Sequence, residues 1–377
     1  MYIQIDNTGF VNKGAELMLS AIVDRLEKEK QIEPKLVFGK GLATLRQVQN
    51  IRLFQIAKMY RCKIRWEWMF HQKYTLDHYG LVKEKNVDVI LDASGFGFGD
   101  QWTGLTTKAN KDLEGYYKKY KKRGTKIIFL PQAFGPFETK IARERIKIVL
   151  DYADLIYARD KISYKHICDV HGDSEKVRIS PDFTILYSRD IPHKLFDDVH
   201  DAIGIIPNSK MLTHTNSETA EKYKRFLIDL CSWVSEKKEK LVILNHSSKD
   251  DWELIKDITS NVNFEYKLLD GLDTDDIKAA IGELKMLVSS RFHGVVSGLN
   301  QGVPTFCTSW SHKYLELLED YSLPDNVVDV HDYESAFEKF GSVLNSDSKY
   351  IPQQAIIEIN KKLTDQMWQD IVDFLKN

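Results

Sequence analysis

Short runs of aliphatic and β-branched residues alternate with longer amphipathic segments along almost the whole chain. Residues 1–6 and 34–39 have the composition of strands, and residues 15–30 between them have the apolar periodicity of a helix. The alternation stops at a polar, irregular stretch, 187–201, and then resumes. Strands that alternate regularly with helices are typical of βα units around a parallel sheet. The sequence therefore predicts an α/β fold with two Rossmann-like domains.

The length of the chain also indicates more than one domain. A single hydrophobic core stops growing at about 250–300 residues, and this chain has 377. We predict an N-terminal α/β domain at 1–195 and a C-terminal α/β domain at 196–355. Residues 356–377 are expected to form a C-terminal helix that can pack back on the N-terminal domain.

Charge and cysteine content narrow the class of protein. A net charge of −2 gives no electrostatic reason to expect a nucleic-acid partner. The four cysteines have neither CxxC nor metal-ligand spacing, which is typical of a reducing compartment. We see no signal peptide and no run near the ~18 apolar residues that a membrane span needs. We expect a cytoplasmic protein with neither a metal nor a bound cofactor.

The junction after one apolar run carries a guanidinium and an imidazole. Ser289 and Ser290 end the run, and we expect them to cap the helix-like segment that follows. Arg291 and His293 then lie in or beside its first turn, where free N–H groups and the helix dipole favour an anion. Arginine can clamp phosphate or carboxylate, and histidine can move a proton near neutral pH. The alternative is a surface arginine and a core-packed histidine.

A second strand-to-helix junction contains Arg159 and Asp160. Asp160 is a candidate helix cap, and Arg159 is a second candidate ligand for an anion. A structural ion pair between the arginine and an aspartate is the alternative interpretation.

The first loop lies between Gly9 and Gly14 and has the spacing of a P-loop start, but Ala-Glu follows where a P-loop has Lys-Ser. The loop also lacks a dinucleotide fingerprint. Asn12 and Lys13 are candidate polar contacts to a substrate, and a plain turn is the alternative.

Other strand ends carry the remaining candidates for substrate binding, which are Gly95, Gly97, Gln132, Asn245, His246 and Lys313, together with Ser290. In open parallel sheets, ligands collect beyond the carboxyl ends of the strands. Cationic and imidazole side chains at such ends in both halves indicate an anionic substrate held in a cleft between the domains.

Several of these junctions form an ordered set over roughly residues 5–315. They read "NKGAELML", "LPQAFGPF", "ARDKISY", "SPDF", "IPNS" and "SSRFHGVVSGLNQGVPTF" followed by "SWSHKY". The set resembles the polysaccharide pyruvyl transferase family. The resemblance implies a GT-B-like fold, with two Rossmann-like domains whose parallel sheets face one another across a cleft. It also implies transfer of pyruvate from phosphoenolpyruvate, the donor substrate, to a sugar, forming a ketal.

By motif match, the resemblance assigns donor binding and catalysis to Arg159, Arg291 and His293, and Lys313 matches a position that is often lysine. His293 is the proton source or the base that takes a hydroxyl proton. The N-terminal domain is implied as the acceptor side. The implied acceptor is a polysaccharide or lipid-linked oligosaccharide of exopolysaccharide or capsule synthesis.

Two departures from the family pattern concern the acceptor side. The chain has "SGFGFGD" where the family usually has a plainer run of three glycines. Ala15-Glu16 follows Gly14 where an acidic residue often follows the glycine directly.

The stretch 44–70 mixes basic and aromatic residues and is a candidate for peripheral contact with the inner membrane face or a lipid-linked sugar. Ordinary amphipathic helices with solvated charges are the alternative. Two rival functions also stay open. One is a nucleotide-sugar glycosyltransferase of GT-B architecture, in which Glu316, Glu319 or Asp320 would hold a ribose. The other is a catalytically silent scaffold in polysaccharide assembly.

Overall fold

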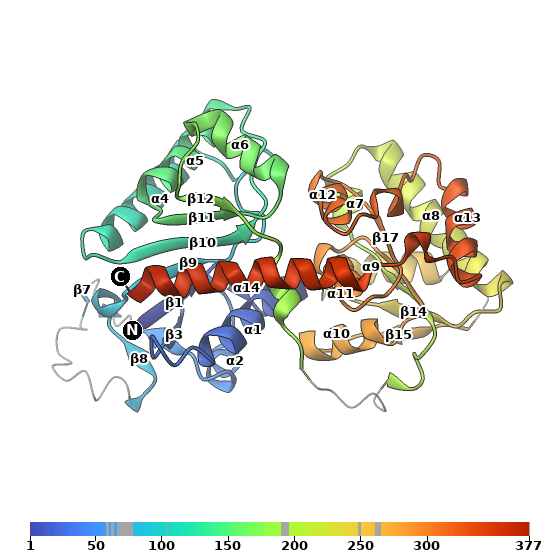
Figure 1. Ribbon diagram of the computed structural model, residues 1–377, viewed down its shortest axis with the longest axis horizontal. Coiled ribbons are helices and arrows are strands. Elements are labelled where there is room, and N and C mark those ends of the chain that lie inside the picture. Colours follow the sequence, from blue (N-terminus) through green and yellow to red (C-terminus); the bar gives the residue numbers. More distant parts are fainter. Residues whose placement is uncertain are drawn as a thin grey trace. The chain divides into compact units, whose positions relative to one another are not determined.

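The computed structural model describes residues 1–57, 60–61, 64–65, 78–102, 104–189, 196–247, 250–260 and 265–376. The chain divides into two compact units. Unit 1 comprises Met1–Phe10, Met18–Phe183 and Gln366–Asn377, and unit 2 comprises Val11–Leu17 and Thr184–Asp365. Each unit is built on a parallel β-sheet, in agreement with the predicted α/β class (Figure 1).

The sheet of unit 1 has the strand order β12-β11-β10-β9-β1-β3-β5-β8, and every pair in it is parallel. Its strands are β1 Tyr2–Asp6, β3 Lys35–Phe38, β5 Phe54–Ile56, β8 Leu81–Val82, β9 Val89–Asp92, β10 Lys126–Gln132, β11 Leu155–Ala158 and β12 Val177–Ile179. The central strands are buried along their length, because helices cover both faces of the sheet.

The helices of unit 1 are α1 Lys13–Glu27, whose first residues belong to unit 2, α2 Leu45–Asn50, α4 Thr107–Lys121, α5 Lys140–Tyr152 and α6 Lys161–His171. Helices α4, α5 and α6 share one hydrophobic core with the sheet. Two short strand pairs complete the unit: β2 Thr8–Gly9 with β4 Gly41–Leu42, and β6 Tyr60–Arg61 with β7 Ile64–Arg65. Its 3-10 helices are η2 Glu84–Asn86 and η3 Phe183–Leu186. Helix η3 crosses the division between the units.

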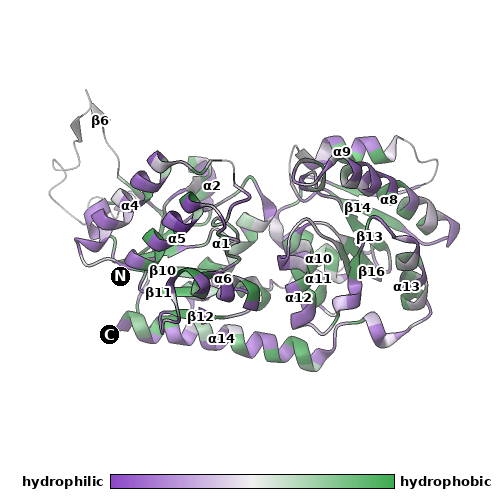
Figure 2. Ribbon diagram, turned by 90° about the horizontal axis from the view of Figure 1, so that it is seen from above, coloured by the Kyte–Doolittle hydropathy of each residue, from purple (hydrophilic) through white to green (hydrophobic). Residues whose placement is uncertain are grey.

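The sheet of unit 2 has the order β15-β14-β13-β16-β17-β18 and is also parallel. Its strands are β13 Ile203–Ile206, β14 Leu241–Leu244, β15 Lys267–Leu269, β16 Met286–Ser289, β17 Thr305–Thr308 and β18 Val327–Val328. Hydrophobic residues dominate β13, β14 and β16, whereas the helices around them are mixed (Figure 2). This difference matches strands that are buried on both faces.

The helices of unit 2 are α7 Lys210–Thr213, α8 Ser217–Glu236, α9 Asp250–Thr259, α10 Thr274–Gly282, α11 Phe292–Asn300, α12 Lys313–Asp320 and α13 Glu334–Leu344. The 3-10 helices η5 Pro324–Asn326 and η6 Ser348–Tyr350 lie near its end. Helices α8, α9 and α13 share one core cluster with the sheet, and α10 lies in another.

The predicted domain boundary, residue 195, lies outside the described residues, and the division between the units falls at Phe183 and Thr184 instead. Hydrogen bonds explain why the segment after residue 183 belongs to unit 2. The Lys278 ammonium donates to the carbonyl of Thr184 at 3.1 Å, and the Asn300 amide donates to the carbonyl of Ile185 at 2.8 Å.

The C-terminal helix, predicted for 356–377, is α14 at Gln354–Lys376. Its residues from Gln366 onward group with unit 1. Trp368 packs edge-on against Phe183, and the Lys126 ammonium donates to the carbonyl of Phe374 at 2.8 Å. The earlier part of the helix groups with unit 2.

Much of the basic and aromatic stretch 44–70 lies outside the described residues, so its predicted membrane contact is not examined by the structure. Leu42, just before this stretch, and Leu45, at its start, are 69% and 67% exposed. Of the helices in the described ranges, none combines the length and the apolar character that crossing a bilayer requires.

Candidate functional site

In each sheet the chain reverses the direction in which it adds strands, and in open parallel sheets a ligand binds at such a reversal. In unit 2 the chain runs from β13 to β14 and β15, then returns to place β16 on the other side of β13. In unit 1 the corresponding neighbours are β1 and β9. Ligands of open α/β sheets bind at the carboxyl ends of the strands at such a switch point. The loops that follow β13 and β16 are therefore the candidate ligand position of unit 2, and those that follow β1 and β9 are the candidate position of unit 1.

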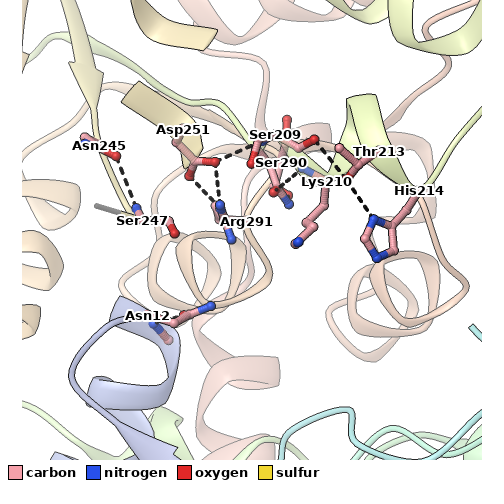
Figure 3. A network of polar contacts seen from close by, with 12 residues as sticks. Asn12, Ser209, Lys210, Thr213, His214, Asn245, Ser247, Asp251, Ser290 and Arg291 are labelled. Carbon is pink, nitrogen blue, oxygen red and sulfur yellow. Dashed lines mark hydrogen bonds and ion pairs between the residues drawn. The ribbon is translucent and has the colours of Figure 1, made fainter. Parts of the chain in front are cut away.

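Arg291 lies directly after β16, at the N-cap of α11, and is buried. Its Nε donates to Asp251 Oδ2 at 2.8 Å and its Nη2 donates to Asp251 Oδ1 at 2.5 Å (Figure 3). Asp251 Oδ1 also accepts the backbone N–H of Ser209 at 2.9 Å. One carboxylate therefore joins the loop after β13 to the loop after β16. It also compensates the charge of the guanidinium in a two-pronged, buried ion pair.

The prediction that Ser289 or Ser290 caps α11 is wrong. Arg291 occupies the N-cap position, and no side chain makes a cap hydrogen bond there. The Ser289 hydroxyl instead accepts the N–H of Arg291 at 3.1 Å and donates to its carbonyl at 2.9 Å. Helix α11 begins only at Phe292, so the residue that precedes its first turn is Arg291 and not a serine.

Ser290 is buried in a network that holds the junction. Its hydroxyl lies 2.7 Å from Thr308 Oγ1 and accepts the Tyr223 hydroxyl at 2.7 Å. Its carbonyl accepts from the Asn208 amide at 2.7 Å and from the Tyr314 hydroxyl at 2.8 Å. Burial raises the pKa of Tyr223, which keeps this phenol a donor. Ser290 was predicted as a substrate contact, but its hydroxyl and carbonyl groups form hydrogen bonds within the protein that hold the loop in place.

His293 lies in the first turn of α11 and is half-buried. A Cβ atom added to Gly14 would lie only 2.4 Å from His293 Nδ1, so the start of α1 approaches the imidazole too closely for a side chain. Asn12 Oδ1 accepts the N–H of Gly14 at 2.8 Å, and the backbone of Asn12 bridges to Ser247. The part of the first loop from Val11 onward therefore belongs to unit 2 and lies against the histidine, and Asn12 acts as a helix cap.

Lys13, the second candidate of this loop, pairs with Glu16 at 2.8 Å. Burial raises the pKa of Glu16, and the nearby Asp273 and Asp275 add to this effect, although Lys13 opposes it. The charge of Lys13 is thus largely compensated within its own helix.

Asn245 and His246 follow β14. The Asn245 amide donates to Asp270 Oδ1 at 2.8 Å, and its oxygen accepts the N–H of Ser247 at 3.2 Å. His246 is buried, and its Nδ1 has no hydrogen-bond partner among the described residues. Burial, followed by the positive charges of Arg291 and His293, holds the pKa of His246 well below its ordinary value. His246 is therefore a neutral imidazole beside two groups that carry or can carry positive charge.

Lys313 is the first residue of α12, and its ammonium lies over the Trp310 ring, 4.6 Å from the centroid. The His214 ring lies 5.3 Å from the same tryptophan, centroid to centroid. Lys210, the first residue of α7, reaches toward the same region as Arg291 (Figure 3).

Sequence reasoning missed Lys210, His214 and Asp251. Lys210 follows the strand-like run that ends in "IPNS", so a lysine just past a strand end was the available signal. Asp251 follows "LNHSSKD", a junction from which the sequence analysis had taken only Asn245 and His246.

The predicted residues of unit 1 gather at the carboxyl edge of its own sheet. Asp6 and Asp92 end the two strands at the switch point and are register partners. The Gln132 amide donates to Asp92 Oδ1 at 3.3 Å, and the Asn7 amide donates to Asp92 Oδ2 at 2.7 Å. Burial raises the pKa of Asp92 above its ordinary value, with the charge of Asp6 contributing. The side-chain amide of Gln132, a predicted substrate contact, therefore donates to the carboxyl group of Asp92.

Arg159 and Asp182 form a buried ion pair at 3.1 Å, which is the structural alternative that the sequence had left open. Asp160 caps α6 as predicted, accepting the N–H of Ser163 at 2.6 Å. Gly95 has a φ of 67°, a left-handed conformation that favours glycine, and Gly97 packs against Ser94. These glycines shape the loop that follows β9.

Unit 1 also contains a cavity of about 460 Å³ beside this edge. Polar and aromatic residues of its wall include Gln4, Lys40, Gln55, Tyr116 and Tyr120. The Tyr116 hydroxyl donates to Asp6 Oδ2 at 2.6 Å, so the cavity wall is hydrogen-bonded to the switch point. Among the residues that the structure describes, no cluster of three or more His, Cys, Asp or Glu side chains is arranged to hold a metal ion.

Comparison with known proteins gives a family and a fold. The family model described as polysaccharide pyruvyl transferase matches residues 12–312. The Neisseria meningitidis UDP-GlcNAc 2-epimerase bound to UDP-GlcNAc is similar in structure, with a TM-score of 0.63 at 12% identity over 99% of this chain and 100% of that one. Anabaena HepE in complex with UDP and glucose gives 0.62 at 12% identity over 100% and 99%. Among curated proteins, none matches the chain.

At such identities the structural likeness shows the fold alone. It supports the predicted GT-B-like class, with two Rossmann-like units.

Proposed function

The chain belongs to the polysaccharide pyruvyl transferase family, and from this premise we propose that it transfers pyruvate from phosphoenolpyruvate to a sugar, forming a ketal. The acceptor sugar belongs to a polysaccharide or a lipid-linked oligosaccharide. The observation that carries the proposal is the cluster of cationic and imidazole side chains at the switch point of the unit 2 sheet. Arg291, Lys210, His293 and His246 all belong to this unit.

The donor that fits such a cluster is small and strongly anionic. Phosphoenolpyruvate carries a phosphate and a carboxylate, and both lose hydration when they bind. Fixed cations and helix-end N–H groups compensate that loss. Arg291 is held rigidly by Asp251, so it contributes orientation as well as charge.

The proposed reaction needs one proton delivered and two removed. Protonation of C3 of phosphoenolpyruvate makes C2 electrophilic, and an acceptor hydroxyl oxygen bonds to C2 as its proton departs. The C2–O bond to phosphate then breaks, its electron pair leaves with the phosphate, and a second hydroxyl oxygen closes the ketal. One acceptor proton balances the proton given to C3, and the other leaves with the phosphate.

We assign delivery of the C3 proton to His293. Gly14 lets α1 pack against its imidazole, which restricts the directions in which the ring can point. A positioned acid of this kind typically contributes ~10²–10⁴ in rate. Neutral His246, whose buried Nδ1 has no bond in the described part of the chain, is suited to accept a hydroxyl proton.

We place the acceptor on unit 1. The charge of Arg159 is compensated by Asp182, so this edge offers hydrogen-bonding groups and aromatic surface more than net positive charge. A neutral sugar is recognised by such groups, and the cavity lined by Gln55 and Tyr116 has the size of a small-ligand site.

The test is an assay of the purified protein with phosphoenolpyruvate and a panel of sugar acceptors. The expected result is stoichiometric release of inorganic phosphate and a new ketal methyl signal in the proton NMR spectrum of the acceptor. Calorimetric titrations with phosphoenolpyruvate and with UDP-sugars provide the contrast. Saturation by a UDP-sugar with no binding of phosphoenolpyruvate would replace the proposal with the glycosyltransferase alternative. A lack of phosphate release with any acceptor, together with a tight protein partner, would favour the scaffold.

A further inference from the structure

We propose that Lys210 and His214, together with Lys313, form a subsite that holds the phosphate group of the donor and then the orthophosphate product. The inference rests on the proposed function and adds two residues, Lys210 and His214, that neither the sequence motifs nor the family resemblance had assigned. It also divides the donor site into two parts: the subsite that binds the phosphate group, and the position beside His293 where C3 is protonated.

Topology places Lys210 at the switch point. It comes four residues after β13, and Arg291 comes two residues after β16, the strand beside β13. The loops after the two strands are tied together, because Asp251 accepts from the N–H of Ser209 and from the Arg291 guanidinium. In Figure 3 the Lys210 ammonium lies between the Arg291 guanidinium and the His214 imidazole.

Charge compensation distinguishes Lys210 from the other basic residues at this edge. Arg291 is paired with Asp251, and Lys13 is paired with Glu16. Among the side chains that the structure describes, no carboxylate lies within ion-pair distance of the Lys210 ammonium. Its charge therefore remains available for an external anion, whereas the guanidinium of Arg291 already shares a buried counter-charge.

Trp310 brings the other two side chains of the subsite to one place. The Lys313 ammonium lies over one region of its ring at 4.6 Å, and the His214 ring lies 5.3 Å away. Thr213 Oγ1 lies 2.9 Å from His214 Nδ1, so the hydroxyl orients the imidazole. The pKa of His214 is lowered first by burial and then by Lys210 and Lys313, so both ammonium groups act on this imidazole.

This arrangement suits a phosphate that must be bound and then released. Negative charge accumulates on the bridging oxygen as the C2–O bond breaks, and two ammonium groups stabilise that charge without supplying a proton. Lysine acts as a compact point charge that can follow the phosphate as it moves away from C2. A neutral His214 adds a hydrogen bond without adding a third full charge that would retain the product.

The test compares Lys210→Met with Lys222→Met, an exposed lysine of α8 in the same unit that pairs with Glu218. We measure KM for phosphoenolpyruvate, competitive inhibition by inorganic phosphate, and calorimetric binding of inorganic phosphate to the full chain. Lys210→Met is expected to raise KM and the phosphate inhibition constant at least ~10-fold, about 1.4 kcal/mol. We expect kcat to change less than KM, and Lys222→Met to match the wild type. His214→Gln is expected to weaken phosphate binding by a smaller factor.

The possible results distinguish a failure of the phosphate subsite from a failure of the proposed pyruvyl transfer. If the wild type releases phosphate from phosphoenolpyruvate and both variants keep wild-type KM and phosphate inhibition, the subsite is wrong and pyruvyl transfer stands. A drop in kcat with unchanged KM and phosphate binding also overturns it, because a phosphate ligand must affect binding. If inorganic phosphate binds through Lys210 but phosphoenolpyruvate is never consumed, the anion subsite is supported and the pyruvyl transfer is overturned.

Discussion

The switch points of the two sheets share a topology and differ in charge. In unit 1 two adjacent strands end in Asp6 and Asp92, and the carboxylate oxygens of both accept hydrogen bonds from neighbouring side chains. In unit 2 the corresponding loops carry Lys210 and Arg291. A parallel sheet provides the same crevice in both cases, but the residue after the strand decides which ligand it favours. An acidic edge disfavours an anionic ligand, and a cationic edge favours one.

The two predicted donor arginines illustrate a second difference. Arg159 meets Asp182 through one nitrogen, whereas Arg291 meets Asp251 through two. A two-pronged pair fixes the plane of the guanidinium as well as its position. Unit 2 therefore holds its arginine in a defined orientation, as a site for a planar or tetrahedral anion requires.

The largest effect is expected from His293→Gln, which tests whether catalysis resides at the cationic edge. Glutamine keeps a polar side chain but cannot deliver a proton at neutral pH, so kcat should fall ~10²–10⁴-fold. The matched control is His331→Gln in the same unit, whose imidazole contacts Thr219 and is assigned no part in the candidate site. Initial rates of phosphate release measure both. Full activity in the His293 variant would remove the catalytic assignment.

Asp251→Asn examines the buried pair of unit 2. The substitution leaves the Arg291 charge without its counter-charge, and breaking a buried pair costs about 3–5 kcal/mol. We expect a lower thermal unfolding temperature and a larger fall than for Asp182→Asn in unit 1, because Asp251 also accepts the N–H of Ser209 and so joins two loops. Asp257→Asn on the same helix is the control, because its pair with Lys224 is on the surface and contributes less than about 1 kcal/mol. Equal melting curves for the Asp251 and Asp257 variants would contradict this interpretation.

Gly14→Ala tests the contact that the start of α1 makes with the imidazole of His293, to which we assign proton delivery. The new methyl group would lie 2.4 Å from His293 Nδ1, so the ring or the start of α1 must move. Displacement of a reacting group by about 1 Å can cost up to ~10²-fold in rate, and we expect at least ~10-fold in kcat. Gly115→Ala, in α4, has nothing within 4 Å of its added methyl group and serves as the control. A Gly14 variant with wild-type kcat shows that the position of His293 does not depend on this contact.

The smallest expected effect is on the pH dependence of stability. A falling pH should destabilise the protein through His246 in unit 2, and a rising pH should destabilise it through Asp92 in unit 1. His246 has a lowered pKa, so its contribution is fully present above the ordinary histidine value of about 6.5 and is lost as pH falls toward the folded pKa. Asp92 has a raised pKa, so its contribution is present below the ordinary value and is lost as pH rises through the folded pKa.

Thermal unfolding of the wild type and of His246→Gln between pH 8 and pH 5 measures the first of these contributions. The variant should lose less stability than the wild type as pH falls below about 6.5. Parallel curves for the two proteins would show that His246 does not titrate in this window.

Fold class and the main junction could be predicted because their signals are local. The apolar runs of β13 and β16 follow from burial on both faces of a parallel sheet, and residues just after a strand stay at its end. Arg291 and His293 were found in this way. The wrong serine cap shows the limit of local signals, since the helix begins at Phe292 and its N-cap is therefore Arg291.

By itself, the sequence determined two parallel α/β units and the chemical character of the groups beyond their strands. It did so because burial periodicity and covalent continuity are properties of neighbouring residues. Only the tertiary structure decided which charges are compensated. Asp251 reaches Arg291 from a different helix, 40 residues away, whereas no carboxylate among the described side chains lies within ion-pair distance of Lys210. Tertiary packing also placed the loop from Val11 onward in unit 2 and brought Gly14 close to His293. These residues are far apart in the sequence, so no local sequence pattern could predict the contact.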